Sequence, residues 1–310
     1  MVTKKNVYII CISTLFIFLD AHTASFLVFG GERGWIGQKI VTILKEQAHL
    51  VYCATAKLED REAIEREIET IKPDYIINSA GIIGKPTVDW CESHKQETLR
   101  ANVLGILNLV DIAYQHNIHI TNIATGCIYQ YDENHPLGSG KGFTEEEKPN
   151  FTGSFYSRTK VLAEDLIVNY PNLLHLRVRM PIASDLNPKG FIGKIINYKK
   201  LINIPNSMSI LDDLLPLIPI MIERRLTGIY NLVNPGTISH NQVIELYKQY
   251  VNPNHHYENF TIEEQNKILA VPRSNCELSA EKLLNEFPQV PHIKESIATV
   301  FKEIANQRKK

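Results

Sequence analysis

Short runs of apolar residues alternate along most of the chain with stretches in which apolar residues recur every three or four positions. The apolar runs predict buried strands at residues 26–29, 50–52, 74–77, 118–123 and 174–178. The helical spacing predicts helices at residues 36–44, 59–71, 97–115 and 155–168. Strands that alternate with helices form βαβ units. The pattern therefore predicts an α/β fold with a doubly wound, mostly parallel sheet of the Rossmann type.

This regularity fades after residue 180. Loop signals rich in asparagine, proline and glycine separate shorter helices at residues 187–190, 203–206 and 234–236. One further strand of the main sheet is expected at residues 228–233. We therefore predict a sheet domain of residues 26–180 and about 228–238, and a smaller C-terminal lobe of residues 181–227 and 239–310. The lobe is expected to cover the carboxyl ends of the strands, where such sheets bind their ligands.

The first 25 residues follow a different pattern. Lys4 and Lys5 precede an apolar run at residues 7–19, and small residues follow that run. This arrangement is typical of a secretory signal peptide, and the run is shorter than the ~20 residues of a membrane-spanning helix. The alternative is an upstream extension or a mis-started reading frame without a secretory role. We expect residues 1–25 to be a leader outside the fold, and the remainder to be a cytoplasmic protein.

The composition is that of an ordinary globular protein. Hydrophobic residues make up 44% and charged residues 22% of the 310 positions, which excludes a mostly disordered chain, a coiled coil and a collagen-like protein. The formal charge of −1 provides no basic field, so nucleic acid is a poor candidate partner. Five cysteines without framework spacing argue against a disulfide scaffold and fit a reducing compartment.

A glycine-rich segment follows the first predicted strand and opens the first predicted helix. Gly31, Gly34 and Gly37 recur there at every third position, with Trp35 and Ile36 between the last two. Such glycines permit a tight turn, a close approach of the backbone to a pyrophosphate, and contact between helix and strand. The helix N-terminus then offers its free amide groups to the phosphates. A plain strand-to-helix turn is the alternative, but the position in the first βα unit favours dinucleotide binding.

The end of the second predicted strand discriminates between nicotinamide cofactors. A carboxylate at this point binds the ribose 2′-hydroxyl of NAD, whereas a basic side chain accommodates the 2′-phosphate of NADP. Residues 53–57 contain no carboxylate and end in Lys57, which favours NADPH, with a solvated surface lysine as the alternative. We assign further cofactor contacts to Asp60, Asn78, Ala80, Tyr156 and Lys160.

Tyr156 and Lys160 are one turn apart on the same face of a predicted helix. An ammonium group so close is expected to stabilise the phenolate and to lower the pKa of the tyrosine from ~10 toward values useful in general acid catalysis. A chance occurrence of this spacing among 13 tyrosines is the alternative, but none of the other tyrosines has a lysine four residues on. We therefore predict a proton relay formed by this pair.

Thr125 and Cys127 end the strand that begins at residue 118. Residues two apart on a strand face the same side, so both side chains are expected to point into the ligand crevice. Thr125 can hydrogen-bond a substrate carbonyl alongside Tyr156. A buried strand cysteine is most often inert packing, but the place of Cys127 at the carboxyl end of the strand favours a catalytic role.

Together these residues resemble the extended short-chain dehydrogenase/reductase family. Longer runs narrow the resemblance to the nucleotide-rhamnose synthase/epimerase-reductases of plants, and the similarity covers about residues 26–305. The runs that carry it are residues 124–129, 135–140, 149–157, 177–181, 203–208 and 272–275. The plant enzymes have no leader like residues 1–25. They generally carry arginine where Lys57 stands and asparagine where Cys276 stands.

The resemblance implies a bifunctional NADPH-dependent enzyme without a metal. It would convert UDP-4-keto-6-deoxy-D-glucose to UDP-L-rhamnose by epimerising C3 and C5 and then reducing C4. A separate UDP-glucose 4,6-dehydratase would supply the keto-sugar, since that domain is fused to the long plant synthases but has no counterpart in this sequence. By the same likeness the reductase set is Thr125, Tyr156 and Lys160, and the epimerase pair is Cys127 and Lys194. Substrate contacts are implied for Asp89, Trp90, Glu92, Asn206 and Arg273.

Two other functions stay open from the sequence. A reductase of the 4-ketosugar alone, similar to dTDP-4-dehydrorhamnose reductases, would not need Cys127. A non-catalytic nucleotide-binding regulatory subunit would tolerate loss of Tyr156 and Lys160, and both are present. The choice between UDP and dTDP sugars and the oligomeric state, for which a homodimer is one candidate, also stay open.

Overall fold

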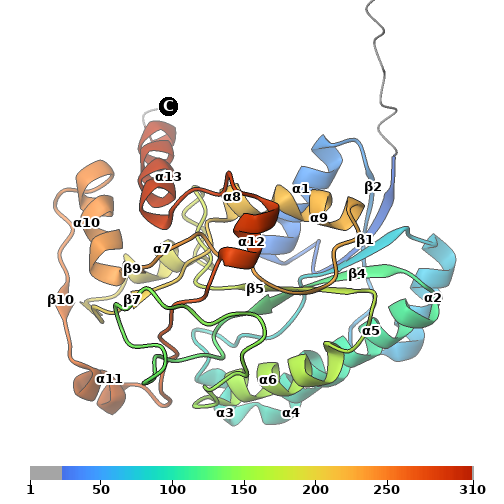
Figure 1. Cartoon of the computed structure of the whole chain (residues 1–310), viewed down its shortest axis with the longest axis horizontal. Coiled ribbons are helices and arrows are strands. Elements are labelled where there is room, and N and C mark those ends of the chain that lie inside the picture. The colour runs from blue at the N-terminus through green and yellow to red at the C-terminus, as the bar shows by residue number, and fades with distance from the viewer. Residues whose placement is uncertain (1–22, 309–310) are drawn as a thin grey trace, which may run out of the picture.

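The computed structural model of the chain describes residues 23–308 (Figure 1). Its centre is a six-stranded parallel sheet in the order β2-β1-β3-β4-β5-β8. The strands are β1 (Ser25–Phe29), β2 (Leu50–Cys53), β3 (Tyr75–Asn78), β4 (His119–Thr125), β5 (Leu173–Val178) and β8 (Gly228–Asn231). The predicted doubly wound parallel sheet is therefore confirmed. The predicted leader lies outside the described residues except for its last three positions.

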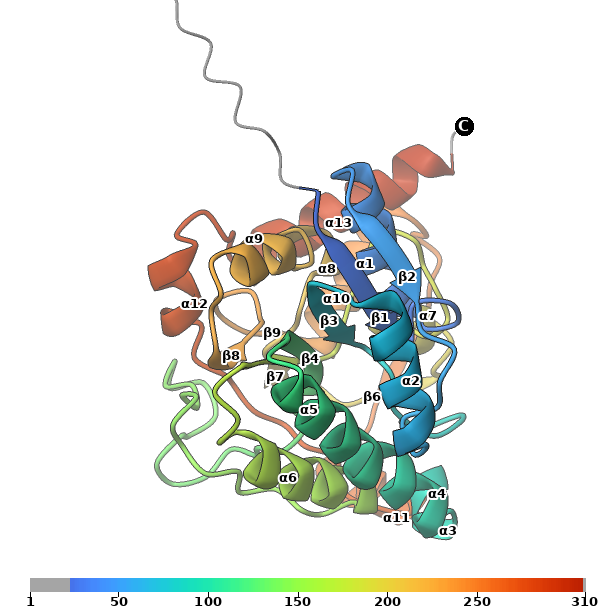
Figure 2. The same cartoon turned by 90° about the vertical axis from the view of Figure 1, so that its right-hand side faces the viewer.

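Helices cover both faces of the sheet (Figure 2). One face carries α2 (Arg61–Ile71), α5 (Gly105–Gln115) and α6 (Phe155–Ile167). The other carries α1 (Trp35–Glu46), α8 (Leu211–Leu214), α9 (Leu217–Glu223) and α12 (Glu281–Glu286). Successive side chains of β1 enter opposite cores, because alternate residues of a strand point to opposite faces. A strand buried on both faces explains why residues 26–29 are continuously apolar.

The order of the strands determines where a ligand can bind. From β1 the chain passes to β2 on one side, and it then crosses back to β3 on the other side. Ligands of such sheets bind in the crevice at this reversal, beyond the carboxyl ends of the strands. The glycine-rich loop after β1 and the residues that follow β3 and β4 therefore converge on one edge of the sheet.

The C-terminal lobe has its own hydrophobic core. Its helices are α7 (Phe191–Ile195), α10 (His240–Tyr250) and α13 (Ile293–Gln307), with the paired short strands β6 (Lys200–Leu201) and β10 (Glu258–Asn259), and β7 (Pro205–Asn206) and β9 (Ile238–Ser239). The proposed boundary assigns residues 211–223 and 281–286 to this lobe, but their buried side chains pack on the sheet instead. The part of the chain that the structure describes has no helix long and apolar enough to cross a membrane.

The helix predicted at residues 97–115 is interrupted. It consists of α4 (Lys95–Leu99), a π-helical turn (Arg100–Leu104) and α5. The buried Asn102 lies in this turn, where its amide accepts a hydrogen bond from the Ile82 nitrogen over 2.9 Å and donates to the Ile82 carbonyl over 2.8 Å. Asn102 in this wider turn thus fixes the loop that follows β3. Single π-helical turns are frequent at functional sites.

The strand expected to end at Cys127 ends at Thr125. After it the chain turns at Gly126, where an added Cβ would lie 2.5 Å from the Leu278 side chain. The Cys127 nitrogen then donates a hydrogen bond back to the Thr125 hydroxyl over 3.1 Å. The prediction that Cys127 belongs to the strand is therefore wrong: it follows a turn, although Thr125 and Cys127 both act on Tyr156.

Candidate active site

The glycine-rich loop joins β1 to the N-terminus of α1. Gly30 has a φ of +79°, and a Cβ on Gly34 would lie 2.5 Å from the Gly30 carbonyl oxygen. A Cβ on Gly37 would meet the same oxygen even more closely. The backbone of this loop is therefore free of side chains beside the N-terminus of α1. The first turn of α1 also has no acidic residue, and both features suit a bound pyrophosphate. Sequence reasoning missed Gly30, although glycine directly after a strand was the available signal.

The other predicted cofactor residues lie around this loop and after β2 and β3. The buried Trp35 donates from its indole nitrogen to Asp185 over 2.7 Å, so its side chain fixes the loop that precedes α7. Lys57 is exposed after β2. Asp60 caps α2 by accepting a hydrogen bond from the Ala63 nitrogen over 3.0 Å. Asn78 accepts from the Ala80 nitrogen over 3.1 Å and so shapes the loop that faces the glycines.

Tyr156 and Lys160 both begin from α6, as predicted. The lysine nitrogen lies 5.9 Å from the centre of the tyrosine ring. Burial raises the pKa of Tyr156, the nearby Cys127 adds to this increase, and a hydrogen bond with Thr125 opposes it. Burial also lowers the pKa of Lys160 to about 8. The expected lowering of the tyrosine pKa by the lysine is therefore wrong for this structure, since desolvation exceeds any charge effect and keeps Tyr156 protonated.

A second pair of titratable groups lies beside the first. The Cys127 sulfur accepts a hydrogen bond from Arg179 Nη1 over 3.5 Å. Burial lowers the pKa of Lys194, on α7, and the charge of Cys127 opposes this decrease, so the two groups interact electrostatically. Cys127 likewise influences the pKa of Tyr156. The charge of Cys127 thus acts on one residue of α6, Tyr156, and on one residue of α7, Lys194.

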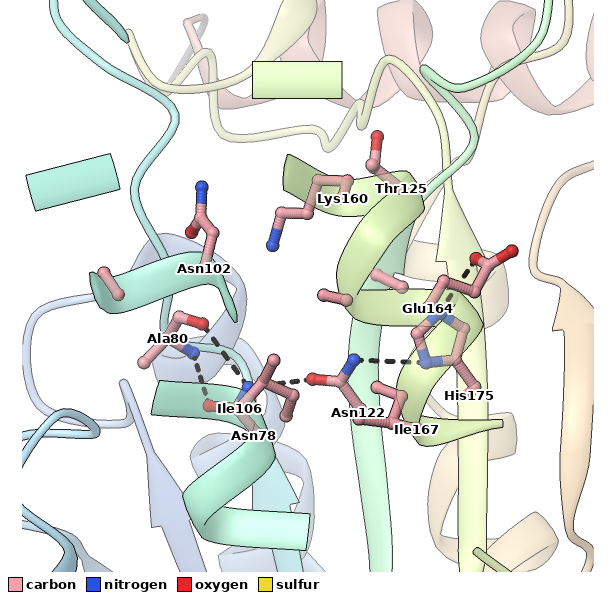
Figure 3. Close-up of a pocket in the computed structure, with 13 residues that line it drawn as sticks. Asn78, Ala80, Asn102, Ile106, Asn122, Thr125, Lys160, Glu164, Ile167 and His175 are labelled. Atoms are coloured by element: carbon pink, nitrogen blue, oxygen red, sulfur yellow. Dashed lines mark hydrogen bonds and ion pairs between the residues drawn. The ribbon is translucent and has the colours of Figure 1, made fainter. Parts of the chain in front are cut away.

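A small cavity of about 20 Å³ extends below Lys160 (Figure 3). That volume suits about one water molecule. Beneath it a buried chain of polar side chains crosses β3, β4 and β5: Asn78 donates to Asn122 over 2.8 Å, and Asn122 lies 3.2 Å from His175 Nδ1. His175 Nε2 lies 3.1 Å from Glu164 of α6. Sequence analysis missed this network, whose members are far apart in the chain.

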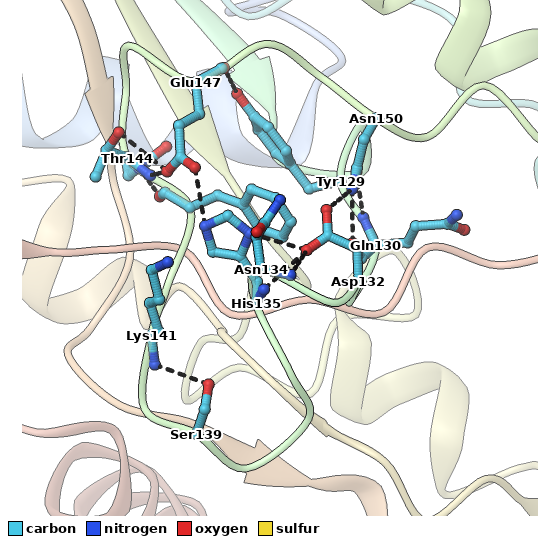
Figure 4. Close-up of polar contacts among 12 residues, drawn as sticks. Tyr129, Gln130, Asp132, Asn134, His135, Ser139, Lys141, Thr144, Glu147 and Asn150 are labelled. Carbon is cyan, nitrogen blue, oxygen red and sulfur yellow. Dashed lines mark hydrogen bonds and ion pairs between the residues drawn. The ribbon is translucent and has the colours of Figure 1, made fainter.

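The segment between β4 and α6 is held by its own polar contacts (Figure 4). The buried His135 lies between two carboxylates, 3.1 Å from Asp132 and 2.9 Å from Glu147. The Tyr129 hydroxyl donates to the Glu147 carbonyl over 2.6 Å, and Asn150 donates to Asp132 over 2.8 Å. These contacts fix the long connection between the two parts of the chain that carry Cys127 and Tyr156.

The residues implied as substrate contacts are engaged within the protein. Asp89 forms a two-fold ion pair with Arg273, over 2.9 and 2.6 Å. Trp90 stacks on His94 at 3.8 Å. Glu92, in α3 (Trp90–Ser93), accepts from the first backbone nitrogen of α6 over 2.6 Å. Asn206 is fully buried and both of its amide atoms have two partners each, namely Arg179 and Cys276 for the oxygen and Ile204 and Asn275 for the nitrogen.

Comparison with known proteins shows what this chain is similar to. Residues 26–186 match the model of the NAD dependent epimerase/dehydratase family. Over 279 residues the chain is 52% identical to a bifunctional dTDP-4-dehydrorhamnose 3,5-epimerase/dTDP-4-dehydrorhamnose reductase of Arabidopsis thaliana, covering 90% of this chain and 92% of that protein.

Two further proteins are similar to this chain, one by sequence and one also by structure. A trifunctional UDP-glucose 4,6-dehydratase/UDP-4-keto-6-deoxy-D-glucose 3,5-epimerase/UDP-4-keto-L-rhamnose-reductase of Arabidopsis thaliana is 52% identical over 273 residues, which are 88% of this chain and 41% of that protein. The crystal structure of the UDP-rhamnose synthase from Acanthamoeba polyphaga mimivirus superposes with a TM-score of 0.87 at 39% identity, covering 91% of this chain and 99% of that one.

Proposed function

This chain belongs to the NAD dependent epimerase/dehydratase family, and we propose that it converts UDP-4-keto-6-deoxy-D-glucose to UDP-L-rhamnose by 3,5-epimerisation followed by 4-reduction. The observation that supports this proposal is that the charge of Cys127 acts both on Tyr156 of α6 and on Lys194 of α7. Tyr156 and Lys160 form one pair, and Cys127 and Lys194 form the other. A reductase alone would need the first pair without the second.

One ketone-binding site can serve both reactions. The C4 ketone of the substrate acidifies the protons on C3 and C5. A base removes each proton, and the enolate oxygen accepts hydrogen bonds from Tyr156 and Thr125. The same two groups then hold the C4 oxygen during reduction, when the protonated phenol donates its proton to the developing alkoxide. The raised pKa of the buried tyrosine suits this donor role.

Cys127 and Lys194 supply the proton exchange at the ring carbons. One member removes the C–H proton, and the other donates a proton to the opposite face of the same carbon. A lysine with a lowered pKa holds more neutral amine near neutral pH, which makes it a competent base. The charge of Cys127 acts on Lys194, as expected of two groups that share one substrate.

The glycine-rich loop fits the pyrophosphate of a nicotinamide dinucleotide, since added Cβ atoms at Gly34 and Gly37 would close it. The bound cofactor supplies the hydride that reduces C4. We propose NADPH as the preferred form, because no carboxylate side chain follows β2 and the exposed Lys57 can meet a 2′-phosphate. NADPH should exceed NADH more than ~10-fold in kcat/KM, and Lys57→Ala should narrow the gap, whereas equal efficiencies would refute this preference.

The proposal also names two partners. The substrate requires a separate UDP-glucose 4,6-dehydratase, an activity that the trifunctional relative carries in its own name. A second copy of this chain is the other partner, because Leu99, Leu104, Leu162 and Leu166 of adjoining helices are 37–46% exposed. Sedimentation should show a dimer that Leu166→Arg weakens.

The decisive experiment separates the two activities. Incubation with the keto-sugar and NADPH should give UDP-L-rhamnose, and Tyr156→Phe should slow NADPH oxidation by ~10²–10⁴ because the general acid is lost. Cys127→Ala should lose deuterium exchange at C3 and C5 in heavy water, yet oxidise NADPH normally when given UDP-4-keto-L-rhamnose. Undiminished exchange in Cys127→Ala would leave a reductase whose cysteine only packs.

A further inference from the structure

Arg179 follows β5 and is completely buried, so it cannot touch a substrate in the crevice. Its Nη1 donates to the Gly126 carbonyl over 3.3 Å and to the Ser274 hydroxyl over 3.0 Å. Its Nη2 donates to the Asn206 side-chain oxygen over 2.5 Å and to the Ser274 carbonyl over 2.8 Å. All of these acceptors are uncharged.

A buried guanidinium normally lies beside a carboxylate, because removing an unpaired charge from water is costly. Within residues 23–308, Arg179 forms no ion pair with a carboxylate, and its Nε has no hydrogen-bond partner. Glu277, a half-buried carboxylate, exerts its charge on Cys276 and Tyr131, on which the charge of Arg179 acts in the opposite sense. The positive charge of Arg179 thus has no permanent counter-ion in the described chain.

The remaining hydrogen bond of this guanidinium goes to the sulfur of Cys127, 3.5 Å from Nη1. In the proposed epimerisation Cys127 either gives a proton to a ring carbon or takes one from it. When it gives the proton, the S–H bond breaks and its electron pair stays on sulfur. When it takes the proton, the sulfur must carry that pair beforehand. In both directions Cys127 is a thiolate on one side of the step.

We propose that Arg179 is a positioning residue for the epimerisation, with its guanidinium as the counter-charge of the Cys127 thiolate. The inference rests on the proposed function and adds a residue to it. The hydrogen bond to the Gly126 carbonyl also fixes the peptide that carries Cys127, so one group sets both the place and the charge of the sulfur. Reduction depends on Tyr156 and Lys160 of α6 and on Thr125 at the end of β4, and the guanidinium donates a hydrogen bond to none of these three residues.

Two substitutions separate charge from shape. Arg179→Met should lower deuterium exchange at C3 and C5, measured without NADPH, by ~10² or more, because the thiolate loses its counter-charge. Arg179→Lys keeps a cation and should recover exchange to within ~10-fold of wild type. Both variants should oxidise NADPH within ~3-fold of wild type when given UDP-4-keto-L-rhamnose, since the general acid is intact. Equal losses of both activities, or no recovery with lysine, would overturn the proposal.

A second measurement needs no turnover and does not disturb Arg179. Cys127→Asp and Cys127→Asn place side chains of the same size beside the guanidinium, one charged and one neutral. At pH 7 the Asp variant should unfold at a temperature at least ~2 °C above that of the Asn variant. The same pair of changes at Cys53, a half-buried thiol that accepts no hydrogen bond from an arginine of residues 23–308, is the matched control and should show no such preference.

The two measurements fail separately. A higher unfolding temperature for the Asn variant at position 127 would overturn the counter-charge, whatever the activity. If the wild-type enzyme exchanges no deuterium, the proposed epimerase function is wrong, and the Asp and Asn variants still decide whether Arg179 requires an anion at residue 127.

Discussion

Arg177 and Arg179 are the two largest fully buried side chains of the described residues, and they stand two positions apart. Their surroundings differ completely. Arg177 donates to both oxygens of Glu164, over 3.1 and 2.5 Å, and its guanidinium lies 5.3 Å from the centre of the Tyr129 ring. Arg179 meets neutral acceptors and the thiol of Cys127. One charge is neutralised within the fold, and the other is not.

The difference separates a structural ion pair from a functional charge. Tyr156, Lys160 and Glu164 occupy successive turns on one face of α6. The bond from Glu164 to Arg177 therefore joins that helix to β5 and fixes the position of both relay residues above the sheet. Among the described residues Arg179 forms no ion pair with a carboxylate. Its positive charge can therefore stabilise an anion that forms during a reaction.

The largest expected effect is on the neutralised pair. Glu164→Gln leaves Arg177 buried without a counter-ion and should lower the free energy of unfolding by about 3–5 kcal/mol, measured by denaturant titration. The double variant Glu164→Gln/Arg177→Met removes both charges and should regain much of this loss. Asp165→Asn, an exposed neighbour on α6, is the control and should cost less than about 0.5 kcal/mol. A double variant as unstable as Glu164→Gln would contradict the claim that the unpaired charge of Arg177 causes the loss.

The next effect is a loss of stability in acid. Burial raises the pKa of Glu164, but hydrogen bonds from His175 and Arg177 more than offset this and bring it to about 2, below its ordinary value of 4.5. A lowered carboxyl pKa stabilises the fold above pH 4.5, and this contribution is lost as the pH falls toward 2. Its full size is about 3 kcal/mol. Unfolding curves of wild type and Glu164→Gln should therefore converge across that range, and parallel curves would contradict the assignment.

Most of the sheet and the relay could be predicted from the sequence because their signals are local. The apolar runs, the glycine-rich loop and the spacing of Tyr156 and Lys160 each lie within a few neighbouring residues. The surroundings of Arg179 could not be predicted, since its partners Asn206 and Ser274 are 27 and 95 positions away. Nor could the raised pKa of Tyr156, because burial depends on the packed fold rather than on the lysine one turn away.

The smallest expected effect on stability concerns a third arginine, Arg273. Its ion pair with Asp89 is more exposed than the side chains of Arg177 and Arg179. Both side chains are 24% exposed, and the hydrogen bond from Arg273 is the main reason for the lowered pKa of Asp89. Solvent screens such a pair, so Asp89→Asn should lower the free energy of unfolding by less than about 1 kcal/mol.

The same change also tests what this pair does. Both residues are implied as substrate contacts, so Asp89→Asn should change KM for the keto-sugar while kcat with bound substrate stays nearly constant, because the relay on α6 is untouched. Steady-state kinetics beside a thermal unfolding curve would measure both effects. If Asp89→Asn destabilised the protein as strongly as Glu164→Gln, the pair would be a structural joint like that of Arg177. The degree of burial would then not explain why the ion pairs of Arg177 and Arg273 differ in their contribution to stability.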